Sequence, residues 1–237
     1  MPALKYNRVL LKLSGEALAG EKGGGFDFDI LKRLATEVSD IVKMGASVGM
    51  VIGGGNIVRG AQLSKMGFER AGADYMGMLG TVINALALQD VLEKADLETR
   101  VMTAIAMESI AEPFIRRRAM RHFDKGRVVI FAAGTGNPYF STDTAAALRA
   151  IQIHADVIIK ATSVDGIYTA DPKKDRTATL YERLSYRDVI VQNLAVMDQT
   201  AITLCAENSL PLIVLNIQRR RAVADAICGA RVGTIVQ

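Results

Sequence analysis

Short apolar runs alternate with longer amphipathic segments along this chain. The runs with the length and β-branched content of strands are, in order, Arg8–Leu13, Ser47–Ile52, Arg100–Thr103, Val128–Ala132, Val157–Lys160, Leu212–Leu215 and Thr234–Val236. Between the first two runs, apolar residues from Ile30 to Val42 recur at helical spacing, with Asp27 or Asp29 placed to cap the helix and Gly45 to end it. The pattern therefore predicts a β-α-β unit at the beginning of the chain.

The strand candidates are apolar without alternation, as in Val128–Phe131 and Val157–Ile159. Strands of that kind are buried on both faces and are typical of parallel sheets covered by helices on each side. The sequence therefore predicts a three-layer α/β/α sandwich around a mainly parallel sheet. Because no repeat, Pro-rich hinge or low-complexity linker divides the chain, we expect a single domain over residues 1–237, with one lobe at about 1–150 and another at about 151–237.

The composition is that of a protein with a large core, since 50% of the 237 residues are hydrophobic. No run reaches the roughly 18 apolar residues of a membrane span, and the N-terminal segment lacks the apolar stretch of a signal peptide. We therefore expect a cytoplasmic protein with no membrane partner. Cys205 and Cys228 are expected to be free thiols. The net charge of +4 suits anionic small substrates as well as nucleic acid and decides nothing.

The segment from about Ala71 to Lys94 is apolar on most of its helical faces. Met76, Met78 and Leu79 belong to this segment, and charged residues are sparse in its middle. We expect such a helix to be covered, either by the core or by another subunit.

Glycine-containing loops follow four of the predicted strands, at Lys12–Gly15, Gly53–Asn56, Ala132–Ala146 and Lys160–Gly166. In an open α/β sheet, ligands bind at the carboxyl ends of the strands because loop backbones and helix N-termini meet there. The three glycines of Gly53–Asn56 can present successive N–H groups to an anion and adopt positive φ, and Arg59 can grip a phosphate. A tight turn is the alternative explanation of the glycines. We expect several phosphate-binding loops to converge on one site.

Two lysines stand at strand ends, Lys12 on the first predicted strand and Lys160 on the fifth. An ammonium group in an apolar strand is costly to bury unless an anion meets it; the alternative is that the long side chain reaches solvent. Two such charges in one crevice suit phosphoryl transfer, which depends on positioning and charge neutralisation. Asp143 and Asp198 are candidates to orient these lysines or a Mg²⁺ ion, or else to cap the helices that follow them.

Other well-known motifs fail in this sequence. Gly15–Gly20 has the P-loop glycine spacing, but Glu21 and Lys22 stand where Lys and Ser or Thr are needed, and no G-x-G-x-x-G follows a strand. His122 and His154 have no second ligand at suitable spacing, so we expect neither histidine to belong to a metal site. The arginine clusters at 116–121 and 219–221 lack interleaved aromatic residues, which argues against a nucleic-acid partner.

In combination, these motifs resemble those of the bacterial uridylate kinases, a family within the amino-acid kinase superfamily. The resemblance runs in order over essentially the whole chain and rests on K-L-S-G at Lys12–Gly15, G-G-G-N at Gly53–Asn56, R-G at Arg59-Gly60, A-D-Y-M-G-M at Ala73–Met78, A-G-T-G-N-P-Y-F-S-T-D at Ala133–Asp143, K-A-T-S-V-D-G-I-Y-T-A-D-P at Lys160–Pro172 and V-M-D at Val196–Asp198. It implies the amino-acid kinase fold and transfer of the ATP γ-phosphoryl group to UMP, giving UDP for pyrimidine nucleotide biosynthesis. This agrees with the failed P-loop.

The resemblance also implies a role for each matching residue. The ATP phosphates would be bound by Lys12, Leu13, Ser14, Gly15, Gly55 and Arg59, and the ATP nucleoside by Thr162, Tyr168 and Asp171. UMP would be held by Gly54, Asp74, Thr135, Gly136, Asn137, Pro138, Tyr139, Phe140, Ser141 and Thr142. Lys12 and Lys160 would stabilise the transferring phosphoryl group, with Asp143 and Asp198 organising them. Mg²⁺ as cofactor, a homohexamer, and GTP and UTP as effectors follow from the same resemblance.

Two departures from the family concern GTP. The segment Gly20–Gly25, aligned with the family's effector-linked loop, reads G-E-K-G-G-G, and Glu93 stands near a position where some GTP-activated relatives carry a basic residue. The sequence therefore leaves GTP activation open.

Two other functions stay open at this point. The first is a kinase of the same fold whose phosphoryl acceptor is a carboxylate or carbamate. Against it, Asn137, Thr142 and Asp74 offer ribose and base contacts that a small acyl acceptor does not need. In a different class, the chain is a non-catalytic nucleotide sensor or RNA-binding regulator that uses the arginine clusters. The two lysines at strand ends favour catalysis.

Overall fold

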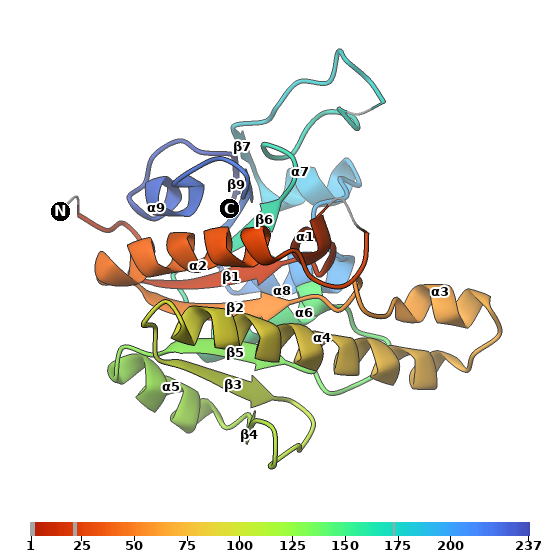
Figure 1. Ribbon diagram of the computed structural model, residues 1–237. Helices are drawn as coiled ribbons and strands as arrows, with labels where there is room; N and C mark the ends of the chain where they lie inside the picture. The colour runs from red at the N-terminus through yellow and green to blue at the C-terminus, as the bar shows by residue number, and fades with distance from the viewer. Residues whose placement is uncertain (1–2, 21–22, 173) are drawn as a thin grey trace.

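The strands form one nine-stranded sheet in a computed structural model that describes residues 3–20, 23–172 and 174–237 (Figure 1). The strands are β1 Arg8–Leu13, β2 Ser47–Ile52, β3 Thr99–Thr103, β4 Glu112–Pro113, β5 Val128–Ala132, β6 Val157–Thr162, β7 Arg183–Leu184, β8 Leu212–Asn216 and β9 Thr234–Val236. All seven strands predicted from the sequence are present, three of them longer by one or two residues. Strands β4 and β7 were not predicted, because a strand of two residues forms no apolar run.

The order of the strands across the sheet is β4-β3-β5-β2-β1-β6-β8-β9-β7. Every neighbouring pair is parallel except β8 and β9, so the prediction of a mainly parallel sheet is confirmed. The chain passes from β1 to β2, β3 and β5 on one side, and only later to β6 and β8 on the other. In doubly wound sheets a crevice opens where the winding changes sides, at the carboxyl ends of the strands. The loops after β1, β2, β5 and β6 therefore meet at one edge of the sheet.

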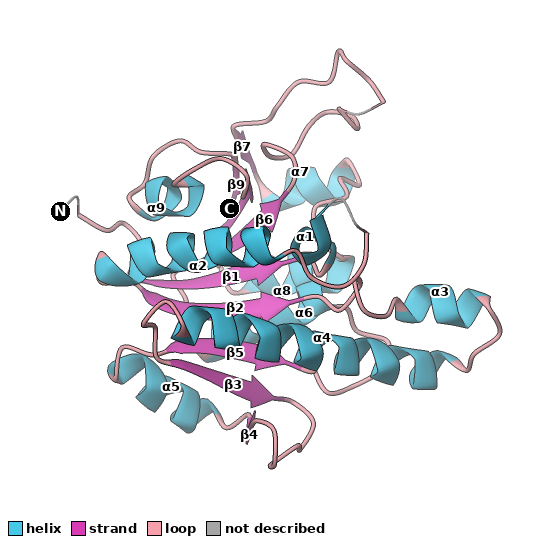
Figure 2. Cartoon of the chain, viewed as in Figure 1, coloured by secondary structure: helices cyan, strands magenta, loops and turns pink. Residues whose placement is uncertain are grey.

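The helices cover both faces of this sheet, which confirms the predicted three-layer sandwich (Figure 2). They are α1 Glu16–Ala19, α2 Phe28–Lys43, α3 Gly60–Lys65, α4 Arg70–Glu93, α5 Arg116–Asp124, α6 Thr142–Gln152, α7 Tyr186–Val191, α8 Gln199–Glu207 and α9 Ala222–Ile227. One layer is made by α2, α4 and α9, and the other by α5, α6, α7 and α8. The start of α2 is capped by Asp27, whose carboxylate accepts the N–H groups of Asp29 and Ile30, and Gly45 follows its end with a φ of +97°.

Strand β1 contributes side chains to both layers of the core. Val9 and Leu11 pack toward α2, whereas Leu10 packs toward α6. Because side chains alternate across a strand, Lys12 projects toward α6 on the same face as Leu10. The alternation of side chains along β1 therefore buries Lys12 under α6, at the carboxyl end of the central strand.

Helix α4 is only half covered. Its inner face is buried against β2, β3 and β5, while Tyr75, Leu79 and Ile83 on its outer face are 44%, 48% and 45% exposed. By length and hydropathy alone α4 would pass for a membrane-spanning helix, and it is the one such helix in the described part of the chain. This likeness does not appear as a run of apolar residues, because polar and charged residues interrupt the apolar stretches of the helix. Half of the apolar window is buried inside the protein.

The two cysteines are free thiols, as predicted. Cys205 of α8 is buried, and Cys228, which follows α9, is half-buried. Burial raises the pKa of the Cys205 thiol to about 11. A thiol that stays protonated at neutral pH is a poor nucleophile, so Cys205 serves packing.

Candidate active site

Two lysines and an aspartate form a buried charge cluster at the carboxyl edge of the sheet. Lys12 of β1 and Lys160 of β6 are register partners on adjacent parallel strands. Both project toward α6, on the same face as Leu10 and Ile158 two residues earlier. Asp143, in the first turn of α6, bridges them: its Oδ1 lies 2.5 Å from Lys12 Nζ and its Oδ2 lies 2.9 Å from Lys160 Nζ. The fold thus brings together three of the predicted site residues.

The charges of this cluster are poorly screened, because the side chains of Lys12 and Lys160 are only 8% and 18% exposed. Burial alone would raise the pKa of Asp143, but the two ammonium groups outweigh it and hold that pKa below its usual value. Burial lowers the pKa of Lys160, with Asp143 opposing the decrease and Lys12 adding to it. Asp143 is the one carboxylate in an ion pair with the two ammonium groups, while Asp198 acts on Lys160 without forming an ion pair, so the lysines can still attract an anionic ligand.

Asp198 orders the cluster through the first turn of α6. It caps α8, where its Oδ1 accepts the Ala201 N–H at 3.0 Å. It also accepts hydrogen bonds from the hydroxyl groups of Ser141, at 2.5 Å, and Thr144, at 2.9 Å. Ser141 is in turn the cap of α6, so the capping interpretation holds for Asp198 but not for Asp143. Thr144 was not selected from the sequence, since a buried helical threonine shows no pattern of its own.

The loop after β1 is a tight turn into α1. The side chain of Leu13 is buried in the α2 layer, and its carbonyl accepts the Gly53 N–H at 2.9 Å. Ser14 Oγ accepts the Ala17 N–H at 3.3 Å. A Cβ on Gly15 would lie 2.5 Å from the Gly53 carbonyl oxygen, so only glycine fits there. The loop therefore offers backbone groups to a ligand, and the Leu13 side chain stays in the core.

The glycines after β2 allow close packing rather than unusual backbone angles. None of Gly53, Gly54 and Gly55 has a positive φ, so the loop does not use the freedom of glycine to adopt one. A Cβ on Gly54 would lie 2.6 Å from the carbonyl oxygen of Gly77 in α4, whereas one on Gly55 would meet only side-chain atoms, at 3.5 Å or more. The loop is wedged between the β1 loop and α4, and Gly55 is its accessible end.

Arg59 lies over this accessible end. Its guanidinium pairs with Glu16 Oε1 at 2.7 Å, and its Nε donates to the Gly55 carbonyl at 3.3 Å. Both charged side chains are substantially exposed, so the ion pair adds little stability. Arg59 is therefore free to exchange Glu16 for a phosphate at small cost.

The loop after β5 has an unusual backbone and is tied to α4. Ala133, Gly134, Gly136 and Tyr139 all have positive φ. For the non-glycine residues this conformation costs about 1–3 kcal/mol each, and such residues cluster at ligand sites. Asp74 Oδ2 accepts the Tyr139 N–H at 2.8 Å. Asp74, predicted as a ligand-binding residue, is also an anchor of this loop.

The other predicted residues of the β5 loop line its surface. Half-buried or exposed positions are Thr135, Gly136, Asn137, Pro138, Tyr139, Phe140, Ser141 and Thr142. Tyr139 is 67% exposed, with the Arg70 guanidinium 5.6 Å from its ring centroid. The loop therefore presents polar groups and two aromatic rings outward. It leads directly into the first turn of α6, where Asp143 of the charge cluster lies.

The predicted nucleoside residues lie at the end of β6 and along the loop after it, which extends away from the sheet (Figure 1). Thr162 Oγ1 donates to the Val164 carbonyl at 2.8 Å. Tyr168 forms an isolated bridge with Leu180, and Asp171 follows three residues later. Since β6 flanks β1 on the side away from β2 and β5, these residues and the β5 loop lie on opposite sides of Lys12.

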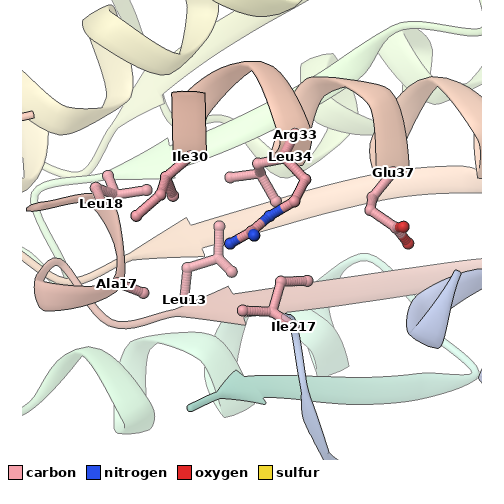
Figure 3. Close-up of a pocket in the computed structure, with 8 residues that line it drawn as sticks. All are labelled: Leu13, Ala17, Leu18, Ile30, Arg33, Leu34, Glu37 and Ile217. Atoms are coloured by element: carbon pink, nitrogen blue, oxygen red, sulfur yellow. The ribbon is translucent and has the colours of Figure 1, made fainter. Parts of the chain in front are cut away.

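A small, mostly apolar pocket lies between β1 and α2 (Figure 3). Leu13 lines it from the α2 layer, so the pocket is on the face of β1 opposite Lys12. It is lined by Leu13, Ala17, Leu18, Ile30, Arg33, Leu34, Glu37 and Ile217. Glu37 Oε1 accepts the Arg221 N–H at 2.7 Å, and burial raises the pKa of this carboxyl group. With about 10 Å³ of free volume the pocket has room for no more than about one water molecule, so it is a feature of packing.

The histidines take no part in the cluster. His122 is buried between Glu112 and Arg127, and His154 is exposed beside Arg116. Within residues 3–20, 23–172 and 174–237, no three His, Cys, Asp or Glu side chains converge as a metal site. The hard oxygen atoms near the lysines come from two aspartates and the hydroxyl groups that Asp198 binds.

Comparisons with known proteins agree with this geometry. The model of the amino acid kinase family matches residues 7–216. The chain is similar to the UMP kinase of Bacillus anthracis, with 44% identity and a TM-score of 0.95 over 98% of this chain and 96% of that one. It is also similar to the UMP kinase of Ureaplasma parvum, with 36% identity and a TM-score of 0.92 over 99% and 100% of the two chains. The uridylate kinase of Archaeoglobus fulgidus is more distant, with 28% identity and a TM-score of 0.73 over 97% and 99%.

The bridging role of Asp143 predicts a pH-dependent loss of stability in Asp143→Asn. The amide keeps the size of the side chain but leaves two buried ammonium groups without their counter-charge, which we expect to cost on the order of 3 kcal/mol at neutral pH. Because the pKa of Asp143 is lower in the folded state, its contribution is complete above about pH 4 and is lost as the pH falls through the folded-state value.

Denaturant titrations at about pH 7 and pH 3 check this prediction. The difference between wild type and Asp143→Asn should be large at the higher pH and smaller at the lower one. Asp90→Asn is the matched control, because its ion pair with Lys94 is well exposed and should change stability little at either pH. Equal differences at both pH values would show that Asp143 does not act as the counter-charge.

Proposed function

The chain belongs to the amino acid kinase family, in its UMP kinase group, and we propose that it transfers the γ-phosphoryl group of ATP to UMP, giving ADP and UDP. The observation that carries the proposal is the buried pair of Lys12 and Lys160, which share Asp143 as their one directly paired carboxylate. Phosphoryl transfer needs little covalent chemistry from a protein and depends on positioning and charge neutralisation. The reaction serves pyrimidine nucleotide biosynthesis in the cytoplasm.

The chemistry needs no general base from the protein. The nucleophile is an oxygen of the UMP phosphate, and a phosphomonoester with a second pKa of about 6 is largely a dianion at neutral pH. A bond forms from this oxygen to the γ-phosphorus of ATP while the bond to the β–γ bridging oxygen breaks. Lys12 and Lys160 stabilise the charge on the transferring group, and Asp143 and Asp198 hold the lysine side of the site in place.

The donor is assigned to the loops after β1, β2 and β6. The ATP phosphates lie against Lys12, Leu13, Ser14, Gly15, Gly55 and Arg59, and the nucleoside against Thr162, Tyr168 and Asp171. The tight β1 turn supports this assignment, because it turns backbone groups rather than the Leu13 side chain to the ligand. The exposed ion pair of Arg59 with Glu16 supports it as well, because a phosphate can replace the carboxylate.

The acceptor is assigned to the loop after β5 and to α4. UMP lies against Gly54, Asp74, Thr135, Gly136, Asn137, Pro138, Tyr139, Phe140, Ser141 and Thr142. The position of this loop supports a division into an acceptor lobe at about 1–150 and an ATP lobe at about 151–237 that holds the nucleoside, because the β5 and β6 loops flank Lys12 from opposite sides. The ATP phosphates reach from the second lobe to the β1 and β2 loops of the first. Asp74 has one oxygen engaged by the Tyr139 N–H, and its other oxygen can accept from a ribose hydroxyl group.

Magnesium fits the donor atoms near the lysines. Mg²⁺ is usually held by one or two carboxylates together with substrate phosphates. Asp143 and Asp198 supply carboxylates, and Ser141 and Thr144 supply hydroxyl oxygens beside them. When bound, the ion would neutralise phosphate charge and orient the ATP phosphates.

Assembly and regulation follow the family in our proposal. The chain forms a homohexamer with the outer face of α4 at a subunit contact, because Tyr75, Leu79 and Ile83 form an exposed apolar stripe there. GTP and UTP are the proposed effectors. Of the residues that bear on GTP, Glu93 lies at the end of α4, whereas Glu21 and Lys22 lie outside the described residues.

A coupled assay of ADP formation tests the proposed reaction. UMP should be the best acceptor among UMP, CMP, dUMP, carbamate and acetylglutamate, because the β5 loop and Asp74 offer ribose and base contacts that the acyl acceptors cannot use. A preference for carbamate or acetylglutamate would assign the chain to another activity of the same fold. RNA binding that weakens steeply with salt, without any ADP formation, would support a regulator instead.

Lys12→Met should lower kcat by a factor on the order of 10² to 10⁴, the scale for losing one preorganised charge from a transition state. The fold and the KM for UMP should change little, since Asp143 keeps its pairing with Lys160. Steady-state kinetics check this, with Lys94→Met as a control that also loses an ion pair, but an exposed one. A Lys12→Met enzyme with nearly normal kcat would contradict the assigned role.

Leu79→Glu should break the assembly, because it places a charge in the middle of the exposed apolar stripe of α4. Light scattering at micromolar concentration should give a mass several times that of one chain for the wild type and a smaller mass for the variant. Val191→Glu, at a more exposed apolar position on α7, is the control and should leave the mass unchanged. A monomeric wild type would contradict the proposed interface.

A further inference from the structure

The inner face of α4 carries two buried polar side chains that none of the roles above uses. Thr81 is 3% exposed and Asn84 is fully buried. A buried polar group is costly unless it is hydrogen-bonded, so the partners of these side chains show what they do. Both reach loops at the carboxyl edge of the sheet, and neither is confined to the helix.

Asn84 is joined to Asn56 by a reciprocal pair of amide hydrogen bonds. Asn84 Nδ2 donates to Asn56 Oδ1 at 2.7 Å, and Asn56 Nδ2 donates back to Asn84 Oδ1 at 3.0 Å. The second hydrogen of Asn84 Nδ2 goes to the Gly53 carbonyl at 2.7 Å, and that of Asn56 Nδ2 goes to the Gly25 carbonyl at 2.8 Å. All four amide hydrogens are used, so the first and last residues of the β2 loop are fixed to one point on α4.

Thr81 anchors the loop after β5 to α4 in the same way. Its hydroxyl donates to the Met78 carbonyl at 2.7 Å and accepts the Ala133 N–H at 2.8 Å. Ala133 is the first residue of the β5 loop with a positive φ, at +61°. Because that conformation is unfavourable for alanine, a buried hydrogen bond to its N–H helps to keep the residue in it.

The backbones of α4 and the β2 loop touch between these two anchors. A Cβ on Gly54 would lie 2.9 Å from the Thr81 nitrogen, and one on Gly80 would lie 3.1 Å from the Gly54 carbonyl oxygen. The helix therefore supports the loop along its length and not only at Asn84. The β1 turn rests on the same support, because Gly53 donates its N–H to the Leu13 carbonyl.

We propose that Thr81 and Asn84 are positioning residues of the phosphoryl transfer, which hold the acceptor loop and the β2 loop at a fixed spacing on one rigid helix. The inference rests on the proposed function, since it assigns the β5 loop to UMP and the β2 loop to both substrates. Thr81 acts on the acceptor side through Ala133. Asn84 acts on both sides, through Gly53 and the β1 turn.

Thr81→Val and Thr81→Ser test the acceptor anchor. Valine keeps the shape of threonine without the hydroxyl group, so KM for UMP should rise roughly tenfold and kcat should fall about ten- to a hundredfold, while KM for ATP stays within about twofold. Serine keeps the hydroxyl group and should bring KM for UMP back to within about threefold of wild type. Thr99→Val is the matched control, because Thr99 is equally buried and donates to the Leu97 carbonyl at the opposite edge of the sheet.

Hydrogen exchange supplies a second readout that needs no turnover. The Ala133 amide should exchange at least about tenfold faster in Thr81→Val than in wild type and Thr81→Ser. Asn84→Ser should raise KM for both substrates; if it does not fold, the Thr81 variants still decide the question. A stable Thr81→Val enzyme with wild-type kcat and KM values would overturn the inference, as would equal changes in KM for UMP and ATP. A wild type without UMP phosphorylation would instead refute the proposed function, and the exchange of Ala133 would still report on the anchor.

Discussion

The shared carboxylate of Asp143 is the interaction on which the rest of the site depends. Two ammonium groups on register-paired strands stay buried and charged only if an anion stands between them, because unpaired buried charge costs several kcal/mol. That anion comes from the first turn of α6, where the helix N-terminus itself favours negative charge. Ser141 caps the turn and Asp198 holds the cap, so β1, β6, α6 and α8 are locked together by one chain of polar contacts.

In the unliganded site, carboxylates of the chain itself partly neutralise the cations. Lys12 and Lys160 face Asp143, and Arg59 faces Glu16. The ion pairs of Asp143 and the ion pair of Glu16 differ in strength. The exposed pair of Arg59 with Glu16 is worth little and is readily exchanged for a phosphate, whereas the buried pairs fix the geometry before any ligand arrives. Preorganised charge of this kind does not have to reorient during reaction, and this is why such a site suits phosphoryl transfer.

The sequence predicted what depends on local pattern. The apolar runs located the strands, and Lys12 and Lys160 stood out because a charge inside such a run requires a partner. The contacts that it could not predict join residues far apart in the chain. The hydrogen bond of Thr81 to Ala133 and that of Asp74 to Tyr139 span 52 and 65 residues. The packing of Gly54 on α4 is likewise invisible in a triple glycine, which equally fits a loop with positive φ.

Helix α4 has two faces with different tasks. Asp74, Thr81 and Asn84 follow helical spacing along the inner face and hold the β5 and β2 loops. Tyr75, Leu79 and Ile83, four residues apart, form the opposite, exposed stripe. In the proposed assembly, a subunit bound to the outer stripe would contact the same packed helix that holds the β5 and β2 loops. The proposed interface and the proposed substrate loops therefore share one element, which is why α4 has to be apolar on its outer face and polar at these points of its inner face.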